Sequence, residues 1–359
     1  MKSPYHALPA YTRWSKAVAG VAPEDMDPVA HFPWQVSSTQ KVATAGSCFA
    51  QHIARHLSKA GFNYYVVEDG HPIGTPEEKA EFNYGTYSGR YGNLYTTRQL
   101  VQLFLRAYGR FTPQEGPWMT PEGRTVDPFR PNIQPHGFFN AQEMEADREQ
   151  HLKAVKHMFE TLDVFVFTLG LTEAWRSKAD GAVFPICPGV AGGTFDAEKY
   201  EFVNFGVADI IDDLKTFFAL LNEVNPNARI ILTVSPVPLM ATAEDQHVLV
   251  STTYSKSALR AAVGEIVRDF THVAYFPSYE IITGAYARGR YFAEDLRSVT
   301  EDGVEHVMGL FLKYVANVDK TAPPKPVAKA PAADNFLAAM QNIVQTTCDE
   351  ELIEASLKA

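Results

Sequence analysis

The sequence predicts an α/β fold built on a doubly wound parallel sheet, and two alternating patterns support this prediction. Short apolar segments rich in Val, Ile and Phe run without the polar alternation of a half-exposed strand, as is typical of strands buried on both faces. Five such segments span residues 41–45, 63–67, 164–169, 230–234 and 273–276. Segments of helical periodicity separate them, and strand–helix alternation with short links indicates a parallel sheet.

Helical periodicity is clearest after the first and third of these segments. Phe49, Ile53 and Leu57 recur at every fourth position, and Gly61 follows as the expected C-cap. An apolar stripe from Val207 to Leu221 marks a second amphipathic helix. Further helices are expected over residues 97–107, 254–270 and 302–314.

The chain is expected to divide into one large domain and three flanking segments. Residues 1–40 contain five prolines and predict an irregular arm, whereas residues 41–317 form the α/β domain. An insertion rich in Tyr, Gly and Pro follows the second strand over residues 68–140, and long insertions at the carboxyl ends of strands usually shape a binding site. Residues 318–334 are typical of a Pro/Ala-rich linker. Residues 335–359 are expected to hold a short amphipathic C-terminal helix (336–345) that docks elsewhere or makes a homo-oligomer.

Charge and composition argue against several classes of function. The chain has 32 Lys and Arg against 42 Asp and Glu, for a net charge of −10, which disfavours nucleic acid or an anionic membrane as the main partner. The longest apolar run is far shorter than the ~20 residues of a spanning helix. No basic start precedes an apolar core, as a signal peptide would require. Three cysteines, Cys48, Cys187 and Cys348, are an odd number that suits a reducing compartment. We therefore expect a soluble, cytoplasmic protein.

The first candidate for chemistry is the junction of a buried strand and a helix in VATAGSCFAQHIARHL. Ser47 and Cys48 follow Gly46 there and stand at a helix N-terminus, where backbone N–H groups stabilise a thiolate or an oxyanion. The alternative interpretation is structural: Ser47 caps the helix and Cys48 is a small buried hydrophobe.

A second candidate is DVFVFTLGLTEAW, in which Gly170, Thr172 and Glu173 follow another buried strand. The carboxyl end of such a strand lines the ligand crevice of an open α/β sheet. The glycine amide and the threonine hydroxyl suit an oxyanion, and Glu173 suits the orientation of a base or a substrate hydroxyl. A plain turn with a solvated Glu173 is the alternative.

The third candidate lies in the insertion, where Asn83, Gly85 and Asn93 stand among aromatic residues. Such a loop offers amide donors and a stacking surface for sugars or acyl chains, unless it is only an ordered surface loop. Asp127 and Arg130 are expected to form a structural ion pair nearby.

Metal binding is not favoured by the histidine pattern. His52 and His56 are spaced i, i+4, as in some zinc sites, but the glutamate that follows the first histidine in such sites is absent. No third ligand is evident in the sequence.

Taken together, the motifs resemble the GSCFA-domain family. Gly46-Ser47-Cys48-Phe49-Ala50 matches the signature of that family, and further motifs in the same order extend the resemblance over about residues 4–317. These are NYGTYSGRYGNLYTTRQL, LGLTEAW, ICPGVAGGTFD, TVSPVPL and YFPSYEI. The family looks like a branch of the SGNH/GDSL hydrolases, which implies a flavodoxin-like three-layer α/β/α sandwich with about five strands. It also implies esterase, thioesterase or O-acyltransferase activity without a cofactor.

Carried over to this chain, the resemblance assigns roles to the candidates. Cys48 takes the nucleophile position, with Ser47 as the close second. Gly85 or Asn83 takes the role of one oxyanion donor. Gly170 and Thr172 stand where the larger group has Gly-x-Asn.

The late acid–base pair departs from the larger group's pattern. Asp295 is present, but Ser298 occupies the expected histidine position. His306 is the substitute one to two turns further on, with Glu173 or His136 as alternatives, or no base at all. Loss of a general base costs typically 10²–10⁴-fold in rate, although a preformed thiolate needs less help.

The leading hypothesis is therefore an acyl-transfer enzyme acting on an ester or thioester of a small molecule or carbohydrate. Its rival is an SGNH-like scaffold that binds a glycan or protein partner without turnover, which Ser298 favours. A third hypothesis makes Cys48 and Cys187 a redox pair.

Overall fold

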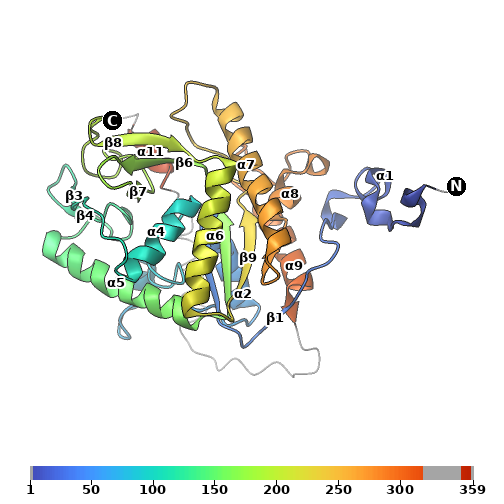
Figure 1. Cartoon of the computed structure of the whole chain (residues 1–359), viewed down its shortest axis with the longest axis horizontal. Coiled ribbons are helices and arrows are strands. Elements are labelled where there is room, and N and C mark those ends of the chain that lie inside the picture. Colours follow the sequence, from blue (N-terminus) through green and yellow to red (C-terminus); the bar gives the residue numbers. More distant parts are fainter. Residues whose placement is uncertain (1–2, 318–348, 357–359) are drawn as a thin grey trace.

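The centre of the molecule is a parallel sheet in the order β10-β9-β5-β2 (Figure 1). The computed structural model describes residues 3–317 and 349–356. The four strands are β2 (Val42–Gly46), β5 (Val164–Leu169), β9 (Arg229–Val234) and β10 (Val273–Tyr275). Both faces of the sheet are buried, which confirms the reading of the continuous apolar segments as interior strands.

The predicted strand over residues 63–67 is reduced to a single bridge. Tyr64 pairs with Val42 at the edge of the sheet, but Val67 donates its N–H to Ser88 of the insertion instead. This segment therefore forms a single bridge at the edge of the sheet and then continues into the insertion.

Two layers of helices cover the sheet, so the fold is the expected α/β/α sandwich. On one face lie α2 (Phe49–Lys59), α8 (Ser278–Thr283) and α9 (Glu301–Tyr314). The other face carries α4 (Thr97–Ala107), α5 (Ala141–Thr161), α6 (Val207–Val224) and α7 (Val248–Asp269) (Figure 1). The predicted helices match these bounds closely, except that α7 begins earlier because His247 caps it at the N–H of Leu249.

The insertion and the segment after β5 build small antiparallel sheets that the sequence patterns did not predict. These sheets contain β3 (Trp118–Met119) with β4 (Thr125–Val126), and β7 (Val183–Phe184), β6 (Glu173–Ser177) and β8 (Tyr200–Asn204). A short helix, α3 (Pro76–Glu81), precedes them. An apolar cluster that includes Trp118, Phe129 and Phe184 joins the two sheets into one lobe.

Buried ion pairs hold the insertion against α5. Asp127 is fully buried and pairs with Arg130 at 3.0 Å and with Arg148 at 2.8 Å, which confirms the expected Asp127–Arg130 pair. Burial alone would raise the pKa of Asp127, but the two guanidinium groups hold it well below its ordinary value. Asp147 pairs in turn with Arg90 and Arg130.

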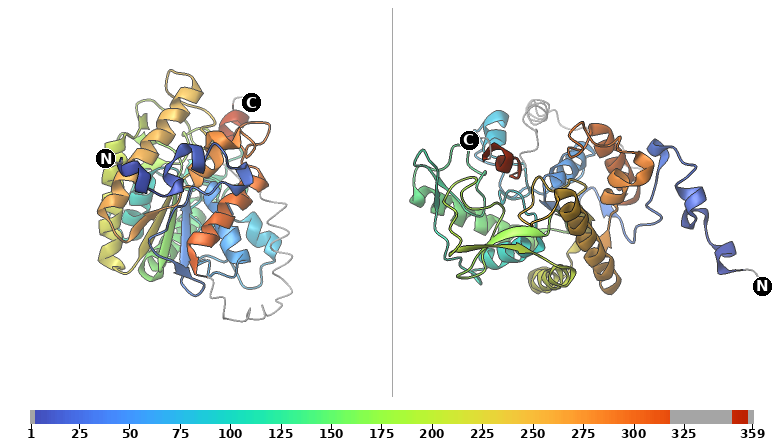
Figure 2. Two further views of the ribbon diagram at one scale, coloured as in Figure 1. Left: turned by 90° about the vertical axis from the view of Figure 1, so that its right-hand side faces the viewer. Right: turned by 90° about the horizontal axis from the view of Figure 1, so that it is seen from above.

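The N-terminal arm extends along the α8–α9 side and away from the body (Figure 2). It returns through β1 (Val36–Ser37), which pairs in parallel with β11 (Ala316–Asn317). Short helical turns interrupt the arm and the α8–α9 connection: η1 (Pro4–Ala7), η2 (Ala10–Thr12), α1 (Trp14–Ala17), η3 (Pro23–Asp25) and η4 (Ala285–Ala287).

The expected linker over 318–334 and the expected helix over 336–345 lie outside the described residues. Within residues 349–356 the chain forms α11 (Glu351–Ser356). No helix in the described part of the chain is both long and apolar enough to cross a membrane.

Gly46 offers a direct test of the closest strand contact in the fold. Its φ is +136°, and a Cβ built there would lie 2.3 Å from the carbonyl oxygen of Thr168. We expect Gly46→Ala to lower the free energy of unfolding by about 2–4 kcal/mol, from overpacking and backbone strain together. Urea denaturation followed by far-UV circular dichroism measures this change.

The matched control is Gly61→Ala. Gly61 also has a positive φ, +79°, but nothing lies within 4 Å of its built Cβ. Strain alone predicts a loss of about 1–2 kcal/mol at that position. An equal loss of unfolding free energy in the two variants would show that the contact between residue 46 and Thr168 adds no cost beyond backbone strain.

Candidate active site

The strand-to-helix corner at the end of β2 places Ser47 and Cys48 at the carboxyl edge of the sheet. Gly46 approaches Thr168 so closely that only glycine fits. The carbonyl of Gly46 accepts the N–H of Leu94 at 2.9 Å, which fixes the insertion to the corner. Cys48 is the residue immediately before α2, so both candidates stand at a helix N-terminus as predicted.

Ser47 is buried, and its hydroxyl has no hydrogen-bond partner among the described residues. It does not cap α2, for which the structure shows no side-chain cap; the purely capping interpretation of Ser47 is therefore wrong. A Cβ built on Gly170 would lie 3.1 Å from the Cβ of Ser47, so Ser47 stands directly beside the end of β5.

Cys48 is 5% exposed and packs in a small apolar cluster of its own. Tyr95, Leu171 and Leu239 are the buried members of that cluster. They come from the insertion and from the loops after β5 and β9. Three loops at the carboxyl edge of the sheet therefore converge on the thiol.

Cys187 is a free, half-buried thiol, and burial raises its pKa to about 11. Its Sγ contacts the carbonyl oxygen of Pro188. Thiol–disulfide exchange needs a thiolate, which a raised pKa opposes. This environment gives no support to a redox pair of Cys48 and Cys187.

The end of β5 presents a second set of buried polar groups. The Gly170 N–H is committed to the carbonyl of Tyr95 at 3.0 Å. Thr172 is fully buried; its N–H donates to Ser255, while its hydroxyl has no partner among the described residues. Glu173 accepts a hydrogen bond from the Thr242 hydroxyl at 2.8 Å, and burial raises its pKa.

Lys256 is a residue at this edge that no sequence motif indicated. It lies on α7, is 2% exposed and donates from Nζ to the carbonyl oxygen of Gly170 at 2.6 Å. Lysine is almost never fully buried without a specific partner. The only signal in the sequence is its place three residues before Leu259, on the inward stripe of the helix.

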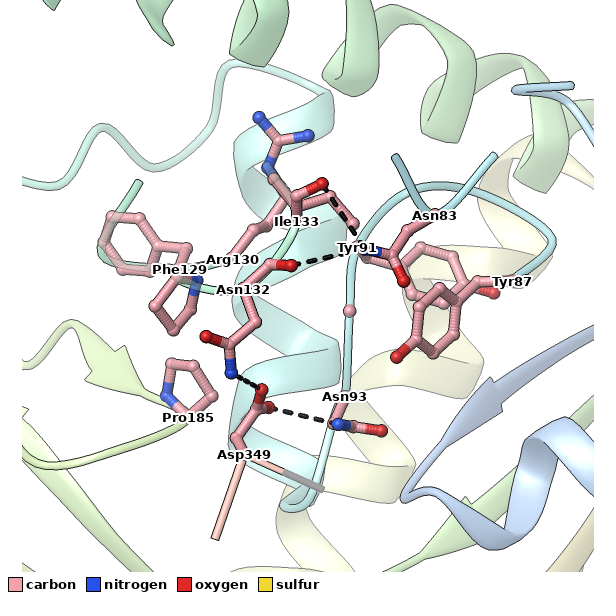
Figure 3. A pocket seen from close by; sticks show the side chains of 12 residues that line it. Asn83, Tyr87, Tyr91, Asn93, Phe129, Arg130, Asn132, Ile133, Pro185 and Asp349 are labelled. Carbon is pink, nitrogen blue, oxygen red and sulfur yellow. Dashed lines mark hydrogen bonds between the residues drawn. The ribbon is translucent and has the colours of Figure 1, made fainter. Parts of the chain in front are cut away.

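Of the insertion candidates, only Asn93 reaches the carboxyl edge with its side chain directed there. Asn83 donates to the carbonyls of residues 132 and 133, and the Gly85 N–H donates to Glu68. Asn83 and Asn93 nevertheless line one pocket together (Figure 3). Tyr87 and Tyr91 line one side of the pocket and Phe129 lines the other (Figure 3).

The structure does not bring the late acid–base candidates together. Asp295 is exposed and accepts hydrogen bonds from Ser298, including its hydroxyl at 2.5 Å. His306 contacts the Tyr291 hydroxyl through Nδ1 and the Met26 carbonyl through Nε2. Both ring nitrogens are therefore committed to the N-terminal arm and its neighbours.

The remaining histidines also lie in structural settings. His136 is exposed in the insertion, with a positive φ. His52 contacts Arg55, and burial lowers its pKa to about 3. The described residues contain no group of three or more His, Cys, Asp or Glu side chains placed to hold a metal ion.

The C-terminal segment lines the insertion pocket through Asp349 and bonds to Tyr95, a contact that no sequence motif indicated. The backbone N–H of Asp349 donates to the hydroxyl of Tyr95 at 3.0 Å, and its carboxyl accepts from the amides of Asn93 and Asn132 (Figure 3). Glu350 accepts from the Met240 N–H. Two residues that are remote in sequence therefore complete the walls of the site.

The fold and the corner define an α/β/α protein with nucleophilic side chains at the carboxyl edge of its parallel sheet. The chain belongs to the GSCFA family, whose model matches residues 41–311. No curated protein matches the chain.

Two solved structures that resemble the chain are esterases. One is an acetyl esterase variant with an acetate ion, and the other is a carbohydrate esterase of family 3 from Talaromyces cellulolyticus. Each is 14% identical and has a TM-score of 0.26; they cover 60% of this chain and 86% and 87% of their own. At that level of likeness, function has to be argued from the site itself.

The unpaired hydroxyl of Thr172 predicts an unusual effect on stability. Thr172→Val keeps the shape and removes a buried polar group without a partner, so we expect the free energy of unfolding to stay constant or to rise by about 1 kcal/mol. Thr233→Val is the matched control, because Thr233 is equally buried but bonded to the Ser278 hydroxyl. That variant should lose about 1–2 kcal/mol.

Urea denaturation measures the unfolding free energy of Thr172→Val and of Thr233→Val. A comparable loss in Thr172→Val would mean that its hydroxyl is satisfied in solution and is not held ready for a ligand.

Proposed function

We propose that this protein is an acyl-transfer enzyme that forms a thioester on Cys48. One observation carries the proposal: the thiol stands at the N-terminus of α2, near the buried hydroxyls of Ser47 and Thr172, which have no hydrogen-bond partner within residues 3–317 and 349–356. An unpaired buried polar group costs free energy, and native structures keep few of them. Their presence at the carboxyl edge of a parallel sheet supports a ligand site there.

Positive electrostatics at the corner support a thiolate nucleophile. The amides at the start of a helix carry the positive end of its dipole. The Lys256 ammonium lies on the other side of Gly170, whose Cα adjoins Ser47. Both favour ionisation of a nearby thiol, against the apolar burial of Cys48, which opposes it.

In the proposed reaction the Cys48 thiolate attacks the substrate carbonyl, and a carbon–sulfur bond forms. The oxyanion is stabilised by the Phe49 amide and by the Thr172 hydroxyl, which replaces the asparagine of the larger hydrolase group. The amides of Ala50 and Gln51 already donate to the carbonyls of residues 47 and 48. The alcohol or thiol then leaves and takes a proton from water. Water or an acceptor hydroxyl next attacks the thioester, which releases the acyl group and restores the thiolate.

A thiolate mechanism fits the contacts of the Asp295–Ser298 turn, where Asp295 bonds to Ser298 and not to a histidine in the described part of the chain. His306 is committed to Tyr291 and Met26, so we assign the electrostatic role to Lys256 instead. Asn93 takes the place expected for Gly85 or Asn83, whose amides are used inside the insertion. Glu173 holds the Thr242 loop that borders the crevice.

The insertion pocket supports an acylated small molecule or carbohydrate as the substrate. Aromatic faces of Tyr87, Tyr91 and Phe129 alternate there with the amides of Asn83, Asn93 and Asn132. Such a lining suits a ring that is apolar on its face and hydroxylated at its rim. The pocket has a free volume of about 20 Å³ with Asp349 in place, room for one water molecule, so a ring can enter only after Asp349 leaves.

A non-catalytic scaffold that binds a glycan or a protein is the second candidate. The bond between Asp295 and Ser298 favours it, because this pair closes on itself where hydrolases of the larger group carry an acid–base dyad. The scaffold predicts ligand binding without an acyl-enzyme.

Intact-mass spectrometry with p-nitrophenyl acetate and acyl thioesters tests the acyl-enzyme. We expect an acyl adduct on the wild-type chain that maps to Cys48, is abolished in Cys48→Ala and persists in Ser47→Ala, because only the thiol is proposed as the nucleophile. An adduct retained in Cys48→Ala but lost in Ser47→Ala would move the role to Ser47.

The same assay is run on the variant Glu350→Lys. Glu350 pairs with Arg297 at 2.9 Å, and the substitution breaks this contact, which holds the C-terminal segment in place. Absence of any adduct in both folded chains would favour the scaffold.

The roles of His306 and Lys256 separate in a second comparison. Loss of the two hydrogen bonds in His306→Asn should lower stability by about 1–2 kcal/mol and leave the acylation rate unchanged. Lys256→Met should lower that rate by about tenfold or more, because it removes the buried positive charge. Stopped-flow acylation and urea denaturation measure the two effects. A fall in acylation in His306→Asn at unchanged stability would restore the Asp295–His306 hypothesis.

A further inference from the structure

Residues 349–356 dock beside the insertion pocket, which Asp349 lines, through contacts on two sides. On the insertion side, Asp349 is bound by the amides of Asn93 and Asn132 and by the hydroxyl of Tyr95 (Figure 3). Tyr95 packs directly against Cys48. The segment is therefore linked to the thiol through Tyr95, which lies between Asp349 and Cys48.

On the opposite side, Glu350 bridges two loops. Its carboxylate pairs with Arg297 at 2.9 Å and accepts the N–H of Met240 at 3.2 Å. The pair is well shielded, with side chains 11% and 9% exposed. Arg297 also donates to the carbonyl of Pro238, which ties the Asp295–Ser298 turn to the loop after β9.

An apolar anchor completes the docking. Leu352 and Ile353 of α11 pack on the lobe cluster that contains Trp118, Phe129 and Phe184. Glu354, on the same short helix, is exposed and stands outside these contacts. The segment is thus held by two carboxyl groups at its start and two apolar side chains behind them.

All side chains that grip the two carboxyl groups are hydrogen-bond donors. Asn93 and Asn132 grip Asp349, and Arg297 grips Glu350. Two amides around one carboxyl group and a guanidinium around the next recognise an acidic ligand. This lining is the opposite of the chain's overall charge of −10.

We propose that residues 349–356 are an intramolecular plug, and that the donors they engage form a subsite for a carboxylate-bearing ligand beside Cys48. The identity of that ligand as a substrate rests on the proposed acyl transfer; the plug itself does not. The segment holds Tyr95 against Cys48 by the Asp349–Tyr95 hydrogen bond, so its departure would free one cover of the thiol.

The raised pKa of Asp349 supports a plug whose docking is weaker at neutral pH than at acidic pH. Burial raises the pKa of Asp349 to about 6 from an ordinary 3.8, while the bonds from Asn132 and Asn93 act in the opposite direction. A docked carboxyl with a raised pKa favours the protonated form, so docking is strongest below about pH 4 and weakens by about 100-fold as pH rises past 6. Glu350, Glu351 and Asp295 add negative charge around it, and Arg297 adds positive charge.

Alkylation of Cys48 by iodoacetamide measures the plug without any need for catalysis. We expect Glu350→Lys, which sets two cations against each other, to raise the labelling rate of Cys48 by about tenfold or more. Glu354→Lys is the matched control, because it makes the same change in charge on an exposed position of the same helix. Peptide mapping reports Cys187 in the same sample, and its rate should stay constant in both variants.

Equal labelling of Cys48 in the wild type and Glu350→Lys would overturn the plug. Hydrogen exchange on the unmodified chain gives an independent reading: amides 350–356 should be protected at pH 5 and less protected at pH 7.5, after correction for intrinsic rates. Full exchange at both pH values would also overturn it.

The ligand class is tested in the opened chain. A peptide with the sequence of residues 349–359, or succinate, should slow the labelling of Cys48 in Glu350→Lys and should fail to do so when Arg297→Gln is added. No effect of either probe would refute the acidic subsite. A chain that opens and binds succinate but forms no acyl adduct would refute acyl transfer alone.

Discussion

The close approach of β2 to β5 at Gly46 is the constraint on which the site depends. A side chain at this position would meet the backbone of Thr168, so the strand ends in a conformation that only glycine adopts easily. The chain then turns sharply, with Ser47 against Gly170 and Cys48 at the start of α2. One backbone contact brings Ser47 and Cys48 together with the N-terminus of α2 and the end of β5. The polar groups gathered there are not fully paired, so the fold gives up stability where it holds a site.

The insertion is held in place by buried ion pairs and not by backbone contacts between strands. Its loops have little regular structure, and buried charges take the place of a sheet. Asp127 and Asp147 neutralise guanidinium groups from two elements and fix the insertion on α5. Removing one partner from such a network leaves a buried charge, which is strongly destabilising. The position of Asn93 relative to Cys48 is therefore set by charges that lie outside the crevice.

Local patterns in the sequence were enough to predict the sandwich and the corner. The interior strands and amphipathic helices follow directly from apolar periodicity, and the corner follows from a strand, a glycine and a helix in succession. The small sheets of the lobe escaped because β3, β4 and β7 are two residues long and carry no period. Lys256 and Asp349 escaped because their partners lie 86 and 256 residues away in sequence, where no spacing rule applies. His306 is one of several substitutes offered for the histidine missing at Ser298, and both of its ring nitrogens contact Tyr291 and the arm, whose path the sequence does not encode locally.

The chain leaves the domain and returns to it at opposite edges of the sheet. β11 ends beside β1, close to Gln35, whose carbonyl accepts a bond from Arg229 at the start of β9, whereas Asp349 lies at the carboxyl edge. Residues 318–348 join the two points, so the docking segment can never diffuse away. A tethered segment competes at an effective concentration on the order of millimolar. A free ligand displaces the segment only if its concentration exceeds this effective concentration or if it binds more tightly. Because the competition is intramolecular, the balance does not depend on the concentration of the protein.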